Sequence, residues 1–448
     1  MKKRFKAILA LVLASGLTVG WNLQNQQMAE ALLGSNTLLS INTTGGPGSH
    51  DSNKPSISND GRYVVFESNA NNLVTGDTNG NTDIFLRDTT ANTTIRVSVD
   101  SSGNQSNHHS YEPVISGNGN YIVYTSMASN LVTGDTNGST DIFRYTIATA
   151  TTERVSISSS SVQGNLDSDS ADIDTEGRFI VFASQANNLS TITDTNNARD
   201  VLWKDMSTGT VKYISQNNLG NLANSFSGQP KISCDGRFIG FQSLASNLIS
   251  GDSNGRTDVF MTDMLGTQTV SGVSIGGDHN SSMGDISCDG NFIVFNSYAS
   301  NLAVNPTPGT VTGDVFRYNR LTGTIDGVST KQNGSAPTHI SNAEAISSDG
   351  RYVIFSGADA SFVTASTDSN GGEDLFLRDM NSTGFRIVSQ TSSGVTGDIA
   401  SAYAEADFSG TNRIAYSASA KNLSSVTDTG NAYDVFMVDV GTPSTCSF

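Results

Sequence analysis

The stretch Pro55-Ser-Ile-Ser-Asn-Asp60-Gly61-Arg-Tyr-Val-Val-Phe66 is followed further along the chain by Asp83-Ile-Phe-Leu-Arg-Asp88. The same two-part phrase returns from Pro113 to Tyr124 and again at Asp141. Self-similarity at a fixed period of this length indicates a repeat architecture. The aspartate that opens the second part recurs at positions 83, 141, 200, 258, 314, 374 and 434, with gaps of 58, 59, 58, 56, 60 and 60 residues. Seven copies therefore account for the chain, and no separate second domain is expected.

Each copy contains four short segments rich in Val, Ile, Phe and Tyr, separated by turns of Gly, Asp and Asn. This pattern is typical of short β-strands. In the first copy the expected strands cover residues 56–58, 63–67, 84–87 and 94–99, and Asp60-Gly61 forms a hairpin turn. One blade cannot cover both of its own faces, so neighbouring copies must pack on it. The predicted fold class is therefore all-β, a seven-bladed β-propeller of four-stranded antiparallel blades. A linear β-solenoid is the alternative, although its rungs are usually shorter.

The two ends of the repeat region complement each other. The seventh copy reaches its third strand at residues 434–439 and has few residues left for a fourth. Near the other end, residues 38–42 followed by Thr-Thr-Gly-Gly resemble residues 95–99 followed by Asp-Ser-Ser-Gly. We therefore expect residues 37–43 to pair with residues 434–440, which removes two exposed sheet edges. The propeller is expected over residues 37–440, with a tail at 441–448.

The first residues have the features of an export signal. A basic segment (Lys2, Lys3, Arg4 and Lys6) precedes an apolar run, and Ala29-Glu30-Ala31 offers a cleavage site. We expect residues 1–31 to be removed and the protein to be exported, periplasmic or extracellular; an uncleaved anchor is the alternative. No other segment is long and apolar enough to cross a bilayer. The formal net charge of −17 argues against nucleic acid as a partner and is compatible with divalent cations.

The segments Ile57-Ser-Asn-Asp-Gly-Arg-Tyr-Val-Val-Phe66 and Asp83-Ile-Phe-Leu-Arg-Asp88 resemble the blade signature of TolB-type β-propellers. In that family a Ser-x-Asp-Gly-x-x-Ile-Ala-Phe stretch precedes an Asp-Ile-Tyr-x-x-Asp stretch. The resemblance recurs seven times across residues 37–440 and implies the propeller fold. It departs from the family type in having seven blades instead of six, longer blades with an inserted loop, and no α/β domain. These departures argue against the family's docking to a peptidoglycan-associated lipoprotein.

Few residues point to catalysis. The sequence has no Gly-x-Ser-x-Gly elbow, no His-Glu-x-x-His and no Gly-rich phosphate loop. Glu112, Glu344 and Glu405 lie at or beside the start of the first strand of their copies, near the expected channel mouth. Two carboxylates at a suitable separation could hydrolyse a glycoside. Charge at the rim without catalysis is the interpretation that we favour.

Four of the five histidines share one position in the repeat, five residues ahead of the first strand segment of copies 1, 2, 5 and 6: His50, His108, His279 and His339. The loops between blades and the loops joining second and third strands emerge on the same face of a propeller. We therefore take these histidines, with Glu112 and Glu344, as candidates for a binding face whose affinity depends on pH between about 5 and 8. The alternative is that repeat duplication copied a solvent-exposed residue with no role.

The loops between second and third strands are candidate calcium sites. Asp77-Thr-Asn79-Gly-Asn81-Thr-Asp83 places oxygen-bearing side chains at alternate positions, and calcium favours a shell of several oxygens. The first, third and seventh positions recur as Asp135/Asn137/Asp141, Asp194/Asn196/Asp200, Asp252/Asn254/Asp258 and Asp368/Asn370/Asp374. No bidentate glutamate follows as in an EF-hand, so weak affinity is expected. The alternative is that Asp and Asn only cap turns through their own backbone.

Cysteine usage leaves the redox question open. Cys234 and Cys288 occupy the same Ser-Cys-Asp-Gly position in two successive copies, and Cys446 lies near the end of the chain. Equivalent positions in neighbouring blades usually exceed the roughly 7 Å Cα separation that a disulfide tolerates, except close to the axis. The sequence therefore leaves open whether Cys234 and Cys288 are joined by a disulfide.

Three functions are compatible with these observations. The leading hypothesis is an exported, non-catalytic propeller that binds a protein, glycan or envelope component through its loop-rich face. The main alternative is a secreted carbohydrate-active or ester-cleaving enzyme with its site at the channel mouth. The third is a cation-stabilised structural domain without a specific partner. Fold alone does not decide among them.

Overall fold

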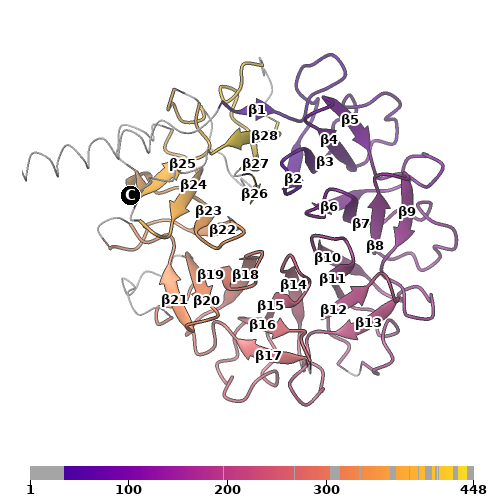
Figure 1. Ribbon diagram of the computed structural model, residues 1–448, viewed down its shortest axis with the longest axis vertical. Coiled ribbons are helices and arrows are strands. Elements are labelled where there is room, and N and C mark those ends of the chain that lie inside the picture. Colours follow the sequence, from indigo (N-terminus) through magenta and orange to yellow (C-terminus); the bar gives the residue numbers. More distant parts are fainter. Residues whose placement is uncertain are drawn as a thin grey trace, which may run out of the picture.

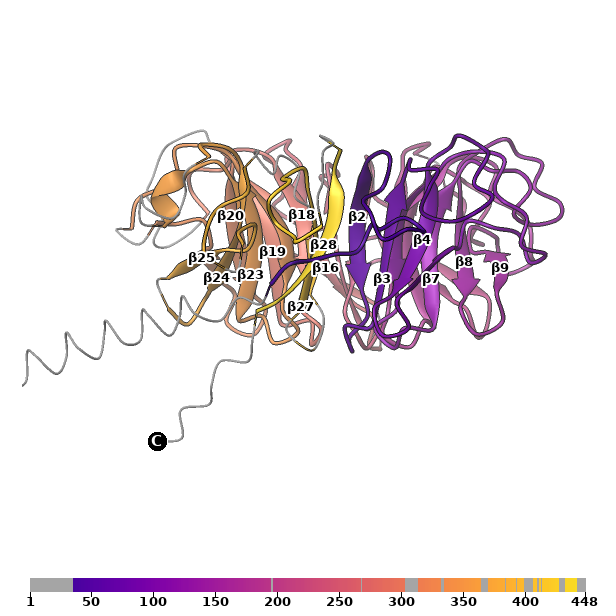
Figure 2. The same cartoon turned by 90° about the horizontal axis from the view of Figure 1, so that it is seen from above.

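The computed structural model describes residues 35–440 except 195, 267, 303–312, 332–333, 364–369, 383, 392, 399–405, 409–410, 412 and 427–431. The expected signal segment (1–31) and tail (441–448) lie outside the described residues. Seven four-stranded antiparallel sheets are arranged around one axis (Figure 1). Figure 2 shows that the strands run between the two faces of the ring. The predicted all-β, seven-bladed fold is confirmed.

The first blade consists of β2 (Ser52–Ile57), β3 (Tyr63–Ser68), β4 (Asp83–Asp88) and β5 (Thr93–Arg96), numbered from the axis outward. The next three blades are β6 (Ser110–Ile115), β7 (Tyr121–Ser126), β8 (Asp141–Thr146) and β9 (Thr151–Arg154); β10 (Ser168–Ile173), β11 (Phe179–Ser184), β12 (Asp200–Asp205) and β13 (Thr210–Tyr213); and β14 (Ser227–Ile232), β15 (Phe238–Ser243), β16 (Asp258–Asp263) and β17 (Thr269–Gly272). The last three are β18 (Ser281–Ile286), β19 (Phe292–Ser297), β20 (Asp314–Asn319) and β21 (Thr324–Gly327); β22 (Ser341–Ile346), β23 (Tyr352–Gly357), β24 (Asp374–Asp379) and β25 (Phe385–Ile387), with a short 3₁₀ helix η1 (Ala360–Phe362); and β26 (Ala406–Phe408), β27 (Arg413–Ala418), β28 (Asp434–Asp439) and β1 (Thr37–Leu38).

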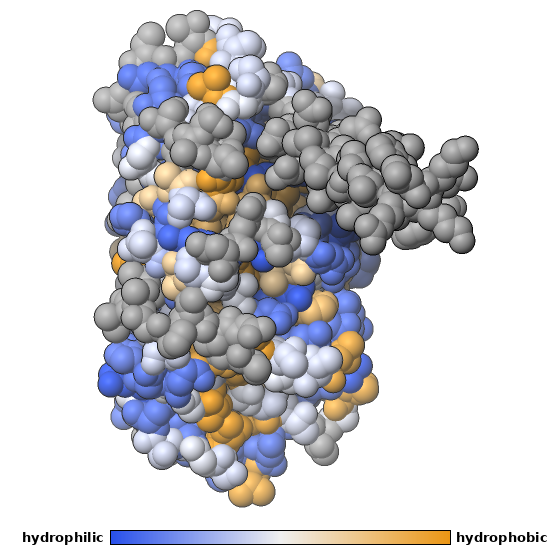
Figure 3. Space-filling view, turned by 90° about the vertical axis from the view of Figure 1, so that its left-hand side faces the viewer, coloured by the Kyte–Doolittle hydropathy of each residue, from blue (hydrophilic) through white to orange (hydrophobic). Residues whose placement is uncertain are grey.

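Two faces of the ring follow from this topology. The loop face carries the second-to-third-strand loops, such as 69–82, and the loops between blades, such as 97–109. The turn face carries the tight turns, such as 58–62 and 89–92. Along the side wall of the ring, hydrophilic and hydrophobic residues are intermixed (Figure 3).

The core lies between adjacent blades. Val64, Val65 and Phe66 of β3 are all fully buried, because both faces of their sheet are covered by neighbouring sheets. Phe66 stacks on Phe85 of β4 with ring centroids 5.9 Å apart. The same aromatic pair recurs in other blades, as Tyr124–Phe143, Phe241–Phe260, Phe295–Phe316, Phe355–Phe376 and Tyr416–Phe436. This burial explains why the middle strands are apolar along both faces.

The recurrent aspartate at the start of each third strand has a structural role. The buried Asp83 accepts hydrogen bonds from the hydroxyls of Ser98 and Ser106. The hydroxyl of Ser98 in turn accepts from the backbone N–H of Ile84. The equivalent pairs in other blades are Asp141–Ser156, Asp200–Ser215, Asp258–Ser274, Asp314–Ser329 and Asp374–Ser389. The aspartate therefore ties the third strand of each blade to the segment that follows the fourth.

The ring closes between the two ends of the described chain, as the sequence predicts, although the pairing covers fewer residues than the expected 37–43, since Ile41 bridges to Pro47. β1 pairs with β28 in antiparallel register, with Thr37 opposite Met437 and Leu38 opposite Phe436. Ser40 donates its hydroxyl hydrogen bond to Asp434, the aspartate of the seventh blade, and accepts one from the N–H of Val435. The closing strand thus supplies the serine that every other blade takes from its own sequence.

Candidate functional site

The innermost strands of the seven blades surround the ring axis (Figure 1). A cavity of about 410 Å³ lies along this axis and is lined from every blade. Its charged lining residues are Lys54, Glu112, Asp172, Lys231, Asp285, Glu344 and Asp407. The candidates Glu112 and Glu344 are thus brought together with charged residues that the sequence analysis did not select. Glu405 lies outside the described residues.

The inner strands are sheet edges, so part of their backbone N–H groups have no strand to pair with. Asp285 accepts hydrogen bonds from such N–H groups in two blades. Its Oδ1 accepts from the N–H of Ile286 at 2.8 Å, and its Oδ2 accepts from the N–H of Ile346 in the next blade at 3.0 Å. A single carboxylate therefore satisfies its own strand and links it to the following blade.

In the other blades, side chains of the inner strands likewise accept hydrogen bonds from backbone N–H groups. Asp172 accepts from its own neighbour Ile173 and, at 2.8 Å, from Ile232 of the next blade. Asp407 accepts from Phe408 at 2.7 Å and from Ile57 at 3.0 Å, and Ser56 accepts from Ile115 at 3.3 Å. Three aspartates and one serine thus provide acceptors for one equivalent N–H group in each of the seven blades. We call this set the axial belt; its N–H groups belong to Ile57, Ile115, Ile173, Ile232, Ile286, Ile346 and Phe408.

Sequence reasoning missed the axial belt. Its aspartates stand one residue before the last residue of the first strand, in copies 3, 5 and 7 only. The signal that could have found them is this shared position: Asp172-Ile173, Asp285-Ile286 and Asp407-Phe408 align with Ser56-Ile57. A carboxylate at this position of an inner strand indicates a group that accepts hydrogen bonds from the backbone of its own blade and of the next one.

Burial controls the protonation of the axial belt. Removal from water raises the pKa of Asp285 to about 6, although the nearby charge of Lys231 opposes the change. Burial also raises the pKa values of Asp172 and Asp407. For Lys231 burial acts to lower the pKa, but the charges of Asp172, Asp285 and Asp407 outweigh it, and the pKa is raised overall. Lys231 is therefore an ammonium ion at neutral pH.

Glu112 belongs to a polar cluster where the inner strands of blades 1 to 3 approach each other. Its carboxylate lies 3.2 Å from the ammonium of Lys54 and accepts from the N–H of Ser170 at 3.2 Å. The N–H of Glu112 donates to Glu67 at 2.9 Å, and burial raises the pKa of Glu67. A second cavity of about 350 Å³ adjoins this cluster and is lined by Glu67, Tyr111, Glu112 and Arg199 among others.

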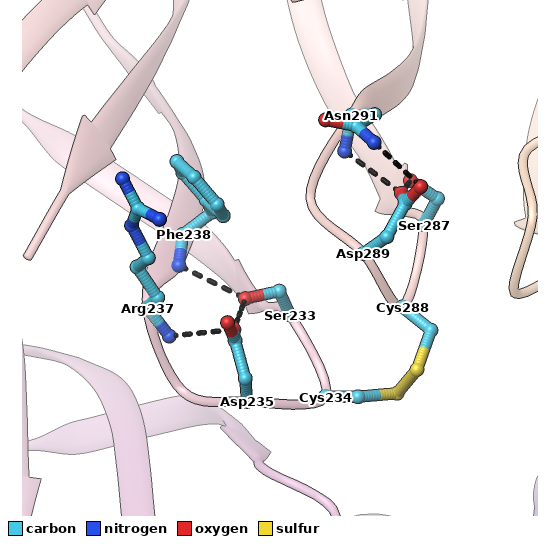
Figure 4. Close-up of a disulfide and its surroundings, with 9 residues drawn as sticks. All are labelled: Ser233, Cys234, Asp235, Arg237, Phe238, Ser287, Cys288, Asp289 and Asn291. Carbon is cyan, nitrogen blue, oxygen red and sulfur yellow. Dashed lines mark hydrogen bonds between the residues drawn. A yellow bond between two sulfur atoms is a disulfide. The ribbon is translucent and has the colours of Figure 1, made fainter.

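At the turn face, the first hairpin turns of neighbouring blades contact each other. Backbone hydrogen bonds run from Asn59 to Gly117, from Asn118 to Thr175, from Thr175 to Cys234 and from Cys234 to Cys288. Cys234 and Cys288 form a disulfide with a Cα–Cα distance of 4.6 Å (Figure 4). The possibility that the sequence left open is thus decided, because these turns lie close enough to the axis for neighbouring blades to meet.

The four predicted histidines occupy equivalent positions on the loop face, each two residues before an inner strand. The side chains of His50, His108 and His339 are exposed, and that of His279 is half-exposed and lies 3.3 Å from Asp278. None of the four lines the axial cavity. Their participation in binding stays a prediction.

The predicted calcium loops are braced by their asparagines. The amide nitrogen of Asn79 donates to Asp83 at 2.9 Å and to the carbonyl of Ser106 at 3.1 Å. The equivalent braces are Asn137 to Asp141 and Gly164, Asn196 to Asp200 and Ala223, Asn254 to Asp258 and Gly277, and Asn370 to Asp374 and Gly397. Each asparagine therefore fastens a second-to-third-strand loop to the adjacent loop between blades.

The first aspartate of these loops also has protein partners. Asp77 lies 3.1 Å from Arg96, and Asp135 lies 3.3 Å from Arg154. Asp194 accepts from the N–H of Asn196, and Asp252 accepts from that of Asn254. Asp368 lies outside the described residues. Within the described part of the chain, no three His, Cys, Asp or Glu side chains are grouped so as to hold a metal ion. Calcium binding stays a prediction, and the hydrogen bonds give a second reason for the repeated Asp-x-Asn.

Comparison with known proteins supports the fold alone. No protein-family model and no curated protein matches this chain in sequence. Among solved structures, oligogalacturonate lyase from Vibrio parahaemolyticus is 13% identical, with 92% of this chain and 97% of that chain covered and a TM-score of 0.53. The propeller domain of the Trilobed protease from Pyrococcus furiosus is 11% identical, with coverage of 88% and 94% and a TM-score of 0.50.

TolB from Acinetobacter baumannii is a more distant likeness. It is 15% identical, 77% of this chain is covered, and the TM-score is 0.41. This chain spans 65% of the length of that TolB structure. The lyase and the protease propeller, at 13% and 11% identity, show a similar fold and nothing further. Across the described residues, no helix is long and apolar enough to cross a bilayer.

The pKa of Asp285 predicts a pH dependence of stability. Its value of about 6 in the folded protein, against 3.8 without the surroundings, means that the folded state holds the proton more tightly. The contribution of Asp285 to the unfolding free energy is therefore fully present below about pH 4 and is lost as the pH rises through about 6. We expect the unfolding free energy of the wild type to fall relative to Asp285→Asn by about 1–3 kcal/mol between pH 4 and 6. Urea titrations at several pH values measure it, with Asp439→Asn as an exposed control. If the unfolding free energies of wild type and Asp285→Asn changed with pH by the same amount, the raised pKa of Asp285 would be contradicted.

The hydrogen bonds that Asn79 donates to Asp83 and Ser106 predict how a charge at this position changes the stability. Asn79→Asp removes two donated hydrogen bonds and places a carboxylate beside Asp83, so in chelator we expect a loss of about 1–3 kcal/mol of stability. Asn81→Asp is the control, since it adds the same charge at a side chain without a hydrogen bond in the described structure. Melting curves with about 10 mM calcium, above the weak-site range, test the metal. A higher melting temperature of the wild type, and recovery of Asn79→Asp, would support calcium; unchanged curves would leave the loops as braced turns.

Proposed function

We propose that this protein is an exported, non-catalytic propeller that binds a protein, glycan or envelope component through its loop face. The observation that carries the proposal is a set of exposed apolar side chains at equivalent loop-face positions. Met127, Leu244 and Tyr298 each follow the second strand of their blade by one residue and are 47%, 43% and 42% exposed. Ile340 precedes an inner strand on the same face and is 50% exposed. Apolar side chains repeated at one position of one face favour an interaction surface.

The construction of the loop face supports this proposal. The asparagine braces join neighbouring loops, so the loops are held in place before any partner arrives. Binding then costs less conformational entropy, which favours a recognition surface. The acceptor oxygens of the axial aspartates already take backbone N–H groups, which is a structural use of these carboxylates. The disulfide between Cys234 and Cys288 is compatible with an oxidising, exported location.

One observation favours the enzyme alternative. Glu67 is shielded beside Glu112 at the second cavity, and burial raises its pKa. A carboxyl group that keeps its proton to higher pH is suited to act as a general acid. A carbohydrate-active site would use this pair at the mouth between blades 1 and 3, and its substrate would enter from the loop face.

The binding proposal predicts which substitutions matter. Residues 32–448 are incubated with isolated cell-envelope fragments and a panel of immobilised polysaccharides, and the bound fraction is measured by sedimentation and on the panel. We expect Leu244→Asp and Tyr298→Asp to lower binding at least about fivefold, since truncating a central apolar anchor costs more than 1 kcal/mol. Leu321→Asp is the matched control, because Leu321 is 68% exposed in a turn on the opposite face.

The same preparations distinguish the two functions. Equal loss in Leu321→Asp and in the loop-face variants would contradict the assigned face, and absence of any bound component would contradict the proposal. Release of reducing ends from the polysaccharide panel, abolished by Glu67→Gln, would replace the binding function by the enzymatic one.

A further inference from the structure

The charges around the axial cavity do not cancel. Lys54 and Glu112 form an ion pair. The carboxylates of Asp172, Asp285 and Asp407 also line the cavity and outnumber the ammonium of Lys231. The cavity therefore has an excess of negative charge inside a chain whose net charge is already −17. Such a lining repels anions and attracts cations.

The surroundings of Lys231 indicate that the electrostatic potential inside the cavity is negative. It lies between Asp172 and Asp285, which occupy the same position in the blades before and after it. Within the described structure no hydrogen bond or ion pair engages its ammonium group. Its pKa is raised in spite of burial because the charges of Asp172, Asp285, Asp407 and Glu112 act on it. The lining thus stabilises a positive charge that is not fixed by direct contact.

The backbone at the loop-face end of the cavity is held in an unusual conformation. Lys54, Glu112, Ser170 and Gln229 occupy the same position in blades 1 to 4 and have φ values of 51°, 53°, 52° and 47°. Each lies at a bulge, where the register of the inner strand shifts. Left-handed conformations of non-glycine residues cost about 1–3 kcal/mol each and concentrate at functional sites. Here the bulges set four polar side chains at the cavity lining.

The arrangement of acceptors favours an organic cation over a metal ion. Each oxygen of Asp285 and Asp407 already accepts a backbone N–H group. Among the described residues these carboxylates do not converge on one point as metal ligands must. An ammonium group needs only separate acceptors at hydrogen-bond distance, because its three N–H donors point in different directions. The carboxylates come from several blades around the cavity, which matches a cation with more than one such group.

We propose that the axial cavity is a binding site for an organic ammonium ion, supplied either as a free linear polyamine or as a lysine side chain of a partner. The ammonium groups donate to Asp407 and Asp285, and the alkyl chain passes Ala345 of the blade between them. A volume of about 410 Å³ is within the range of small-ligand cavities. This site is separate from the loop face proposed above and does not depend on it.

Lys231→Met provides the test, because the two cations compete for the same carboxylates. Calorimetry measures the binding of spermidine to residues 32–448 at low ionic strength. Removing the lysine charge from the cavity is expected to tighten spermidine binding about tenfold. No hydrogen bond within the described structure is lost, but the charge that offsets the buried carboxylates is removed, so the fold of Lys231→Met is checked by circular dichroism. Lys212→Met is the matched control: it makes the same charge change on β13, where Lys212 lies over the ring of Trp203, and should leave binding unchanged.

A second variant and a second probe complete the test. Asp407→Asn should weaken binding about tenfold, with its fold checked by circular dichroism because Asp407 also serves the axial belt. An end-blocked peptide with one lysine separates the two sources: tighter binding of the peptide than of spermidine assigns the site to a partner's side chain. Absence of binding by spermidine and peptide at about 1 mM, in the wild type and in Lys231→Met, would overturn the proposal. Equal affinity of Lys231→Met and wild type would overturn it as well. The loop-face variants Leu244→Asp and Tyr298→Asp should bind spermidine normally.

Discussion

Every blade of this ring ends at the axis in a strand edge, and the exposed backbone N–H groups of that edge need acceptors where no further strand can fit. The axial belt meets this constraint with very few side chains. Each of Asp172, Asp285 and Asp407 accepts from two N–H groups, one in its own blade and one in the next. Because each carboxylate joins two blades, satisfying the edge also fixes the spacing between neighbouring blades. Junctions without such an aspartate have other links, including the disulfide between Cys234 and Cys288.

This solution makes the centre of the molecule acidic. Carboxylates buried near the axis carry raised pKa values, and Lys231 offsets only part of their charge. The chemistry of the cavity therefore follows from a structural need, and a cation that enters it finds acceptors already oriented by backbone hydrogen bonds. The loop face is organised differently. There, asparagines such as Asn79 fasten loop to loop, and exposed apolar side chains project from a fixed framework. The two regions can bind different partners without sharing residues.

The sequence predicts what all seven copies share and misses what only a few contain. The seven-blade fold and the pairing of residues 37–38 with β28 follow from motifs that recur at a fixed period, because the same packing is required in every blade. Asp172 and its counterparts appear in alternate copies only, so they look like variation until the strands are placed around one axis. The disulfide depends on how closely two turns approach, which spacing along the chain does not give. The calcium motif shows a further limit, since the pattern of Asp and Asn is also what a hydrogen-bonded brace requires.

The central claim is that individual carboxylates hold specific inner-strand amides, and hydrogen exchange at those amides tests it most directly. Exchange measured residue by residue in the wild type should show slow exchange at the amides of Ile57, Ile232, Ile286 and Ile346. In Asp285→Ala, protection should be lost at Ile286 and Ile346, whose N–H groups that carboxylate accepts, and kept at Ile57 and Ile232. Unchanged protection at Ile286 and Ile346, or an equal loss at all four amides, would contradict the account.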